Sequence, residues 1–419
     1  MLDIPIIIGL LLASFIHGCA KKKNKKRVET ARSIAQSPSS SPNITPPPVP
    51  SKREKSKKES KIVEEDTPPP PIDLTPDKYF STEVPYEPLS EWLQIVVTRY
   101  IEWELLIFNN EPDCENVRKR KWFLQFDKNP TLNRYEAPKC YDYSRVVLKN
   151  RKNDYINATW MFYENVKNIL TQGPLSNTIP DFWAMICQEN VEYIVMLCSF
   201  IEKSVEQSAQ YYPLEEGGVE KYEEFEVRCV KKEKDPVEGV TWTILEITDS
   251  DGKTKRTVNH IHVSWWPDKT APEDAKLTIE LYRWLSKKSS KFPKVYHCDS
   301  GLGRSACFLA VDMFLRIYQL SYDDIHHSKT NERINFYVRN MRNGAIDSPL
   351  LQLFLLVCIL EFCHQEKKGI TQEKQDNGSI ISYKWLVFYD AFVKDYQRYR
   401  GKLIEDPNAK IELPKRTPG

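Results

Sequence analysis

Hydrophobic residues are spaced along this chain in two patterns. They recur every three or four positions in residues 89–103 and fill most of residues 306–316, and both stretches are predicted to be helices. Residues 222–257 alternate between apolar and polar side chains and contain turn residues, which predicts antiparallel strands. Short apolar runs at 195–197 and 292–296 are typical of buried strands. The pattern therefore predicts a globular domain that contains both helices and strands.

The segment before this domain, residues 21–84, is rich in Ser, Pro, Lys and Glu and has few large apolar side chains. Such a segment cannot bury enough surface to fold, so we interpret it as a disordered, basic and proline-rich linker. The stretch from Pro47 to Lys52 fits a polyproline ligand of SH3-type domains, although a plain spacer is the alternative.

Residues 4–20 form an apolar run without charge, and a basic cluster at 21–27 follows at once. The run is barely long enough to span a bilayer. A secretory signal carries positive charge before its apolar core, whereas here only Asp3 precedes it. We interpret residues 1–20 as a membrane anchor that leaves the body of the protein in the cytoplasm. A cleaved signal and an apolar start to a soluble cytosolic protein are the alternatives.

The C-terminal extension, residues 366–419, contains aromatic side chains at roughly helical intervals: Trp385, Phe388, Phe392, Tyr396 and Tyr399. We predict one helix there, added to the surface of the domain. A helix that binds a partner or a membrane is the alternative.

The amino-acid composition is that of an ordinary globular protein and excludes few classes of function. The 419 residues, 41% of them hydrophobic and 28% charged, allow one large domain plus tails. A net charge of +2 gives no reason to expect a nucleic-acid partner. The ten cysteines show neither a disulfide framework nor a C-x-x-C pair, which is typical of reduced thiols in the cytosol.

One turn carries candidate chemistry, because Cys298 follows a predicted strand and precedes a predicted helix. Gly301 and Gly303 allow the loop to curl so that its backbone N–H groups converge, and the following helix adds its positive end. A thiol at the floor of such an anion-binding loop is expected to have a lowered pKa and to act as a nucleophile. Arg304 supplies a planar fork for two phosphate oxygens, and Ser305 can hydrogen-bond the sulfur.

The sequence His297-Cys298, five residues, then Arg304-Ser305 resembles the phosphate-binding loop of the protein tyrosine phosphatases. We refer to residues 298–305 as the phosphate loop. Other motifs that resemble this family occur in the expected order between residues 85 and 365, and the alternative, a buried core cysteine, is disfavoured for that reason. The resemblance implies a three-layer α/β fold with a twisted mixed sheet flanked by helices.

Two further site residues come from the resemblance. Trp266-Pro267-Asp268, thirty residues before Cys298, is similar to the loop that carries the general acid, and Asp268 would later act as the base that activates water. Tyr135 would form the wall against which a phosphotyrosine ring stacks. Glu202 matches an acidic residue that holds the phosphate-loop arginine.

The chain also departs from the family pattern. Ala137 stands where an acidic residue usually binds the substrate backbone, and Gln207 replaces a usual lysine. Asp347 and Leu351 align with glutamines, one of which positions the hydrolytic water. Asp347 is expected to raise the electrostatic cost of the second step. Asp299 would raise the pKa of Cys298 if its carboxylate pointed inward.

The resemblance implies hydrolysis of phosphotyrosine in proteins through a cysteinyl-phosphate, without metal or cofactor, because the loop and Arg304 supply the positive charge. The alternatives are a phosphotyrosine-binding pseudophosphatase that protects or recruits partners and, with less support, a dual-specificity or lipid phosphatase. The catalytic residues would be Cys298, Arg304, Asp268 and Ser305, and the substrate-binding residues would be Tyr135, Asp299, Ser300, Gly301, Leu302, Gly303 and Asp347.

Overall fold

A computed structural model describes residues 92–93, 96–97, 123–163, 166–249, 252, 255–288, 291–320, 327–368, 372–374, 380–382 and 385–406. All of them belong to one compact unit, Asp66–Gly419. The predicted anchor, the linker and the segment from Pro47 to Lys52 lie outside the described residues, as does most of the helix predicted at 89–103. Among the described residues, no helix is both long and apolar enough to cross a membrane.

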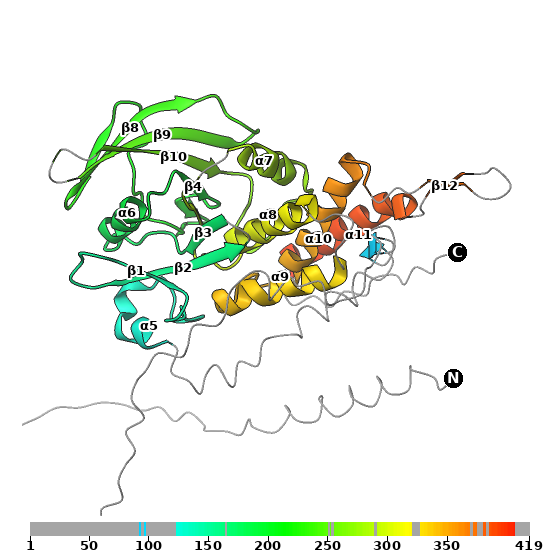
Figure 1. Ribbon diagram of the computed structural model, residues 1–419, viewed down its shortest axis with the longest axis horizontal. Helices are drawn as coiled ribbons and strands as arrows, with labels where there is room; N and C mark the ends of the chain where they lie inside the picture. Colours follow the sequence, from blue (N-terminus) through cyan, green and yellow to red (C-terminus); the bar gives the residue numbers. More distant parts are fainter. Residues whose placement is uncertain are drawn as a thin grey trace, which may run out of the picture. The chain divides into compact units, whose positions relative to one another are not determined.

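A nine-stranded mixed sheet forms the centre of the fold, with the strand order β1-β2-β3-β11-β4-β10-β9-β8-β7 (Figure 1). β11 is parallel to both of its neighbours, β3 and β4, and β4 is parallel to β10, whereas the outer pairs are antiparallel. The strands are β1 (Arg145–Val147), β2 (Tyr155–Tyr163), β3 (Val166–Thr171), β4 (Tyr193–Met196), β7 (Val219–Tyr222), β8 (Phe225–Glu233), β9 (Val240–Thr248), β10 (Lys255–Val263) and β11 (Lys294–His297).

The alternation of side chains along the strands divides the interior into two cores. In β11, Val295 belongs to one core and Tyr296 to the other, and in β4 the same division separates Ile194 from Val195. Neighbouring residues of a strand point to opposite faces of the sheet, so each face carries its own apolar layer. Both faces must therefore be covered by helices.

One face is covered by α6 (Ile179–Gln188), whose Phe182 and Trp183 are buried in the first core. The opposite core is filled by helices of the C-terminal half, which Figure 1 shows in olive green to red. They are α7 (Lys276–Ser286), α8 (Arg304–Leu320), α9 (His327–Met341), α10 (Pro349–Gln365) and α11 (Trp385–Glu405). This arrangement of helix, sheet and helix confirms the predicted three-layer α/β fold.

Local sequence explains where α10 begins. The Ser348 side chain accepts a hydrogen bond from the Leu351 N–H, and Pro349 occupies the first turn, where its missing N–H costs nothing. Residues 350–363 are buried on every side of the helix, as expected for a helix without a polar face. Asp347 is thereby held just before the amino-terminal end of a rigid, buried helix.

The remaining elements are short. They are α5 (Leu124–Lys128), the 3-10 helix η1 (Pro130–Leu132), the hairpin of β5 (Ile201–Glu202) and β6 (Val205–Glu206), and the hairpin of β12 (Gln372–Lys374) and β13 (Ile380–Ser382). The hairpin of β5 and β6 matters for function because it carries Glu202.

Candidate active site

The phosphate loop connects β11 to α8 and is shaped by Gly301. This residue has a φ of 72°, and a side chain there would meet the Thr171 carbonyl oxygen at 2.3 Å, so only glycine fits. The turn aims the Gly301 N–H at Sγ of Cys298, 3.3 Å away. The Ser305 hydroxyl lies 3.3 Å from the same sulfur. Cys298 therefore occupies the floor of an anion-binding loop, at the amino-terminal end of α8.

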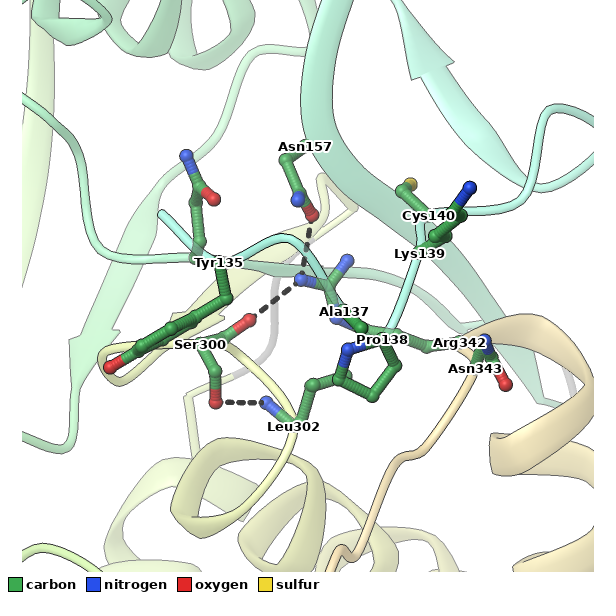
Figure 2. Close-up of a pocket in the computed structure, with 11 residues that line it drawn as sticks. Tyr135, Ala137, Pro138, Lys139, Cys140, Asn157, Ser300, Leu302, Arg342 and Asn343 are labelled. Atoms are coloured by element: carbon green, nitrogen blue, oxygen red, sulfur yellow. Dashed lines mark hydrogen bonds between the residues drawn. The ribbon is translucent and has the colours of Figure 1, made fainter. Parts of the chain in front are cut away.

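The carbonyl groups of this loop are fixed from behind by Arg342, which is buried. Its Nε donates to the Gly301 carbonyl and its Nη2 to the Ser300 carbonyl, both at 2.9 Å. The same side chain donates to Asn157 Oδ1 and Thr159 Oγ1 of β2, at 2.9 and 3.0 Å. Figure 2 shows the bonds of Arg342 to Asn157 and Ser300. Because the carbonyls are held away from the sulfur, the N–H groups remain turned toward it.

A chain of neutral rings supports His297, the residue before Cys298. The Tyr211 hydroxyl lies 2.7 Å from Nε2 of both His297 and His260, and Nδ1 of His297 lies 3.1 Å from the Cys298 carbonyl oxygen. Since a carbonyl only accepts, Nδ1 of His297 carries the proton, and its Nε2 accepts from Tyr211. Burial lowers the pKa of His297 to about 3 and that of His260 well below its usual value, so both rings are neutral.

Arg304 is buried beneath the rim of the site, with 2% of its side chain exposed. Its Nη1 donates to Glu202 Oε1 at 2.6 Å, as the resemblance predicts, and to the Trp266 carbonyl at 3.2 Å. Its Nη2 lies 3.3 Å from Asp268 Oδ1 and 3.4 Å from Asp299 Oδ1. One guanidinium group therefore gathers three carboxylates from three different segments.

Asp268 lies in the acid loop, which we define as residues 266–272. Its N–H donates to Glu202 Oε2 at 2.8 Å, and the Trp266 indole N–H donates to the Thr270 carbonyl at 2.9 Å, which closes the loop on itself. Burial raises the pKa of Asp268, and the Asp299 carboxylate raises it further, whereas Arg304 opposes both. A raised pKa keeps more of this carboxyl protonated, which suits a proton donor.

Tyr135 forms the wall of the site opposite the acid loop, with 44% of the residue exposed. Its hydroxyl donates to Asp299 Oδ2 at 2.9 Å. Burial works against ionisation of Asp299, yet the Arg304 guanidinium and this hydrogen bond hold the pKa of Asp299 below its ordinary value. Asp299 thus remains a carboxylate that points into the site, between the aromatic wall and the arginine.

These residues surround a cavity of about 350 Å³. Asp347 lines it beside Gly303, where an added Cβ atom would be 3.1 Å from the Asp347 carboxylate. Although part of Asp347 is exposed, burial of the carboxylate and the neighbouring Asp299 raise its pKa to about 6. The cavity is lined by Tyr135, Ala137, Pro138, Asp268, Lys269, Thr270, Asp299, Ser300, Leu302, Gly303, Arg304, Asp347, Ser348 and Leu351.

The pKa of Cys298 differs from the sequence-based expectation. We expected the loop to lower it, but burial raises it, and the Asp299 carboxylate adds to the increase. Arg304 and the hydrogen bonds of Ser305 act in the opposite direction without outweighing burial. Asp299 points inward, which is the condition under which we expect it to raise the pKa of the thiol.

Every predicted site residue lies in this cavity or directly beneath it, but sequence reasoning missed several supporting residues. It gave no role to Arg342, Tyr211 or His260. Gln207 was noted only as a departure, and its Oε1 accepts from Arg304 Nη2 at 3.3 Å. Arg342 and Gln207 each lie in a segment that resembles the family. The available sequence signal for Arg342 was its place between Met341 and Asn343 in that segment, where a charged side chain could have been considered as a support for the phosphate loop. Gln352 does not substitute for the aligned glutamines, because it is buried and donates to the Ile346 carbonyl at 3.3 Å.

Comparison with known proteins agrees with this geometry. The family model for the protein-tyrosine phosphatase matches residues 129–361. Tyrosine-protein phosphatase non-receptor type 2 of Homo sapiens is 33% identical over 244 residues, which cover 57% of each chain. The protein of that name from Mus musculus is 32% identical over 302 residues, covering 68% of this chain and 71% of the relative. Receptor-type tyrosine-protein phosphatase eta of Gallus gallus is 30% identical over 278 residues, 64% of this chain and 19% of that relative.

The matched region contains the phosphate loop, the acid loop, Tyr135 and Asp347, and it ends before α11. The chain spans 57% of the length of the human and rat relatives. The match covers more than half of the chain, and the geometry of its loops agrees with the resemblance noted in the sequence. The chain belongs to the protein-tyrosine phosphatase family.

Proposed function

We propose that this chain hydrolyses phosphotyrosine in proteins through a cysteinyl-phosphate. The observation that carries the proposal is that the Arg304 guanidinium and the Asp268 carboxyl meet at the cavity, while Cys298 Sγ and the Gly301 N–H lie in the same phosphate loop whose residues line it. A nucleophile, an anion site and an acid are the groups that phosphoryl transfer requires.

In the first step the Cys298 thiolate attacks phosphorus, and the bond from phosphorus to the tyrosine oxygen breaks. Asp268 gives its proton to the leaving phenolate. The N–H groups of the phosphate loop and Arg304 stabilise the charge on the equatorial oxygens. Tyr135 contacts the aromatic ring of the substrate and so selects a long phosphotyrosine over a shorter phosphoserine.

In the second step water attacks phosphorus and the bond between sulfur and phosphorus breaks. The Asp268 carboxylate accepts a proton from the water, inorganic phosphate leaves, and the Ser305 hydroxyl donates a hydrogen bond to the departing thiolate. Asp347 lines the same cavity, so its negative charge opposes the negative charge that develops on the attacking water oxygen as the water loses its proton. We infer that this step is the slower one.

A second function, phosphotyrosine binding with little turnover, is supported by one observation. Asp347 and Leu351 line the cavity at the positions where the family has glutamines, one of which positions the hydrolytic water. Their replacement acts against the second step, whereas the Gly301 N–H and Arg304, which would bind the phosphate, are in place.

Stopped-flow hydrolysis of an aryl phosphate by the wild-type chain, Cys298→Ser and Asp347→Gln separates the two functions. We expect a fast release of phenolate followed by slow turnover, faster turnover in Asp347→Gln, and no release in Cys298→Ser. A wild-type chain that releases no phenolate but binds a phosphotyrosine peptide tightly would be a reader of phosphotyrosine.

We also propose that the domain acts in the cytosol. All eight described cysteines are free, which fits a reducing compartment. Tethering by residues 4–20 is a separate proposal from the sequence: the full chain should pellet with membranes and a chain starting at Val28 should not. Docking of an SH3-type domain between Pro47 and Lys52 should be lost when these prolines are replaced by alanine.

A further inference from the structure

The acid loop is contacted by α11, a helix that lies outside the residues matched by the family. The Tyr396 hydroxyl donates to the Pro272 carbonyl, and Arg400 Nε donates to the Ala271 carbonyl at 2.5 Å. Two consecutive carbonyl groups at the end of the acid loop are therefore bound by side chains one helical turn apart. These residues are more than a hundred positions away in the sequence.

α11 has a fixed position because its aromatic face is buried. Trp385, Phe392 and Tyr396 each have 0% of their surface exposed and belong to the same core as α10. Their spacing of seven and four residues places them on one face of the helix. Figure 1 shows α11 in red beside α10. The Tyr396 hydroxyl is inside this layer, so the Pro272 carbonyl supplies the partner that a buried hydroxyl needs.

A second connection runs through aromatic rings. The Tyr396 ring stacks on Phe354 of α10 with centroids 6.0 Å apart, and Phe354 meets the Trp266 ring edge to face at 5.2 Å. The carbonyl of Trp266 accepts from Arg304 at 3.2 Å. Tyr396 thus acts on both ends of the acid loop, at Pro272 by a hydrogen bond and at Trp266 through Phe354.

We propose that α11 is a positioning element for the general acid, with Tyr396 and Arg400 as positioning residues. By fixing residues 266–272 against α10, they hold the Asp268 carboxyl beside Arg304, where it can protonate the leaving group. The proposal rests on the proposed phosphatase function, since it assigns α11 to one step of that reaction. Loss of these contacts should weaken proton donation and leave the attack by Cys298 unchanged.

The test compares two aryl phosphates that differ in their need for an acid. A phosphotyrosine peptide has a poor leaving group, whereas a dinitrophenyl phosphate releases a phenolate that needs no proton. In the full chain, the double variant Tyr396→Phe with Arg400→Gln should lose roughly 10- to 100-fold in kcat on the peptide and about twofold or less on the dinitrophenyl ester. In an Asp268→Asn background, the same two changes should have little further effect on the peptide.

The matched control is Lys394→Gln, which removes the same charge from an exposed position of the same helix. It should leave both rates within about twofold of wild type. Tyr396→Phe keeps the ring against Phe354, and Arg400→Gln alone changes a partly exposed residue, so each single variant can be tested if the double variant unfolds.

Three results are decisive. A loss confined to the peptide, absent in the Asp268→Asn background, supports the role of α11. An equal loss on both substrates, or losses that multiply with that of Asp268→Asn, overturns it while leaving the phosphatase function intact. A wild-type chain that cleaves neither ester contradicts the phosphatase function and removes this role together with it.

Discussion

The phosphate loop and the acid loop face the same cavity but are held in different ways. Main-chain bonds fix the phosphate loop: the Leu197 N–H donates to the His297 carbonyl, the Gly173 N–H to the Asp299 carbonyl and the Ile346 N–H to the Leu302 carbonyl, at 2.7–2.8 Å. The acid loop depends on side chains from β5, α8 and α11. The position of Cys298 is thus set by main-chain bonds from segments next to the sheet and to α10, whereas the position of Asp268 can change while Cys298 stays in place.

The variant Arg342→Met should produce the largest effect. Arg342 is a side chain that fixes the phosphate loop, in addition to the main-chain bonds named above. Its removal leaves buried carbonyl and side-chain oxygens without a donor, which costs roughly 3–5 kcal/mol of unfolding free energy. Urea unfolding measures the loss, and activity should disappear with it. Arg283→Met, which breaks a surface pair with Glu366, should cost under about 1 kcal/mol.

Asp268→Asn should isolate the acid loop. We expect kcat on a phosphotyrosine peptide to fall by about 10²- to 10⁴-fold, with no loss of thermal stability. The acid must be protonated, so wild-type activity should decline as the pH rises through the raised pKa of Asp268, and this alkaline decline should be absent in the variant. Asp274→Asn, whose carboxylate accepts from the Lys276 N–H outside the cavity, is the control and should keep the decline. A decline that persists unchanged in Asp268→Asn would assign it to another group.

Asp299→Ser should sharpen the comparison by changing the charge of the phosphate loop and leaving its main-chain bonds intact. Burial still raises the pKa of Cys298, but the contribution of Asp299 is gone, so more thiolate is present at a given pH. Alkylation of Cys298 by iodoacetamide at pH 6–7 should be several-fold faster, because the thiolate is the form that reacts. Asp235→Ser removes an exposed turn carboxylate and should leave the rate unchanged. An equal rate in Asp299→Ser and wild type would show that this carboxylate does not act on the thiol.

Asp347→Asn should have the smallest effect, on stability. The folded pKa of Asp347 is about 6, above the value of about 3.9 in an unfolded chain. Between these values the native state binds more protons than the unfolded state, so its stability falls as the pH rises through this window. The variant lacks this fall. Its gain in unfolding free energy over wild type should be absent below pH 4 and fully developed above pH 6. The gain should stay under about 1 kcal/mol, because Asp347 is exposed to solvent. Melting temperatures of both proteins across this pH range measure it. A constant difference from pH 4 to 7 would contradict the titration.

Sequence alone could predict the family and the three-layer fold, and it could name the residues that the structure brings together at the candidate site, because each is contained in a short local motif. The loop from Cys298 to Arg304 and the tripeptide at Asp268 are such motifs. The contacts of Arg342 with β2 and of α11 with Pro272 could not be predicted, since they join residues far apart in the chain. The pKa of Cys298 was mispredicted because the balance between burial and loop dipoles depends on depth and on the rotamer of Asp299.

The hydrogen-bonded rings of His260, Tyr211 and His297 lie next to Cys298. They add no titration of their own to the pH dependence of the site, although two of the three are histidines. His297 and His260 take up no proton in the range where enzymes are usually assayed, because the pKa of each lies far below that of a free imidazole. No switch of tautomer then disturbs the Cys298 carbonyl as the solution is acidified toward pH 5. The steps of a rate profile can accordingly be assigned to carboxyl and thiol groups without an imidazole between them.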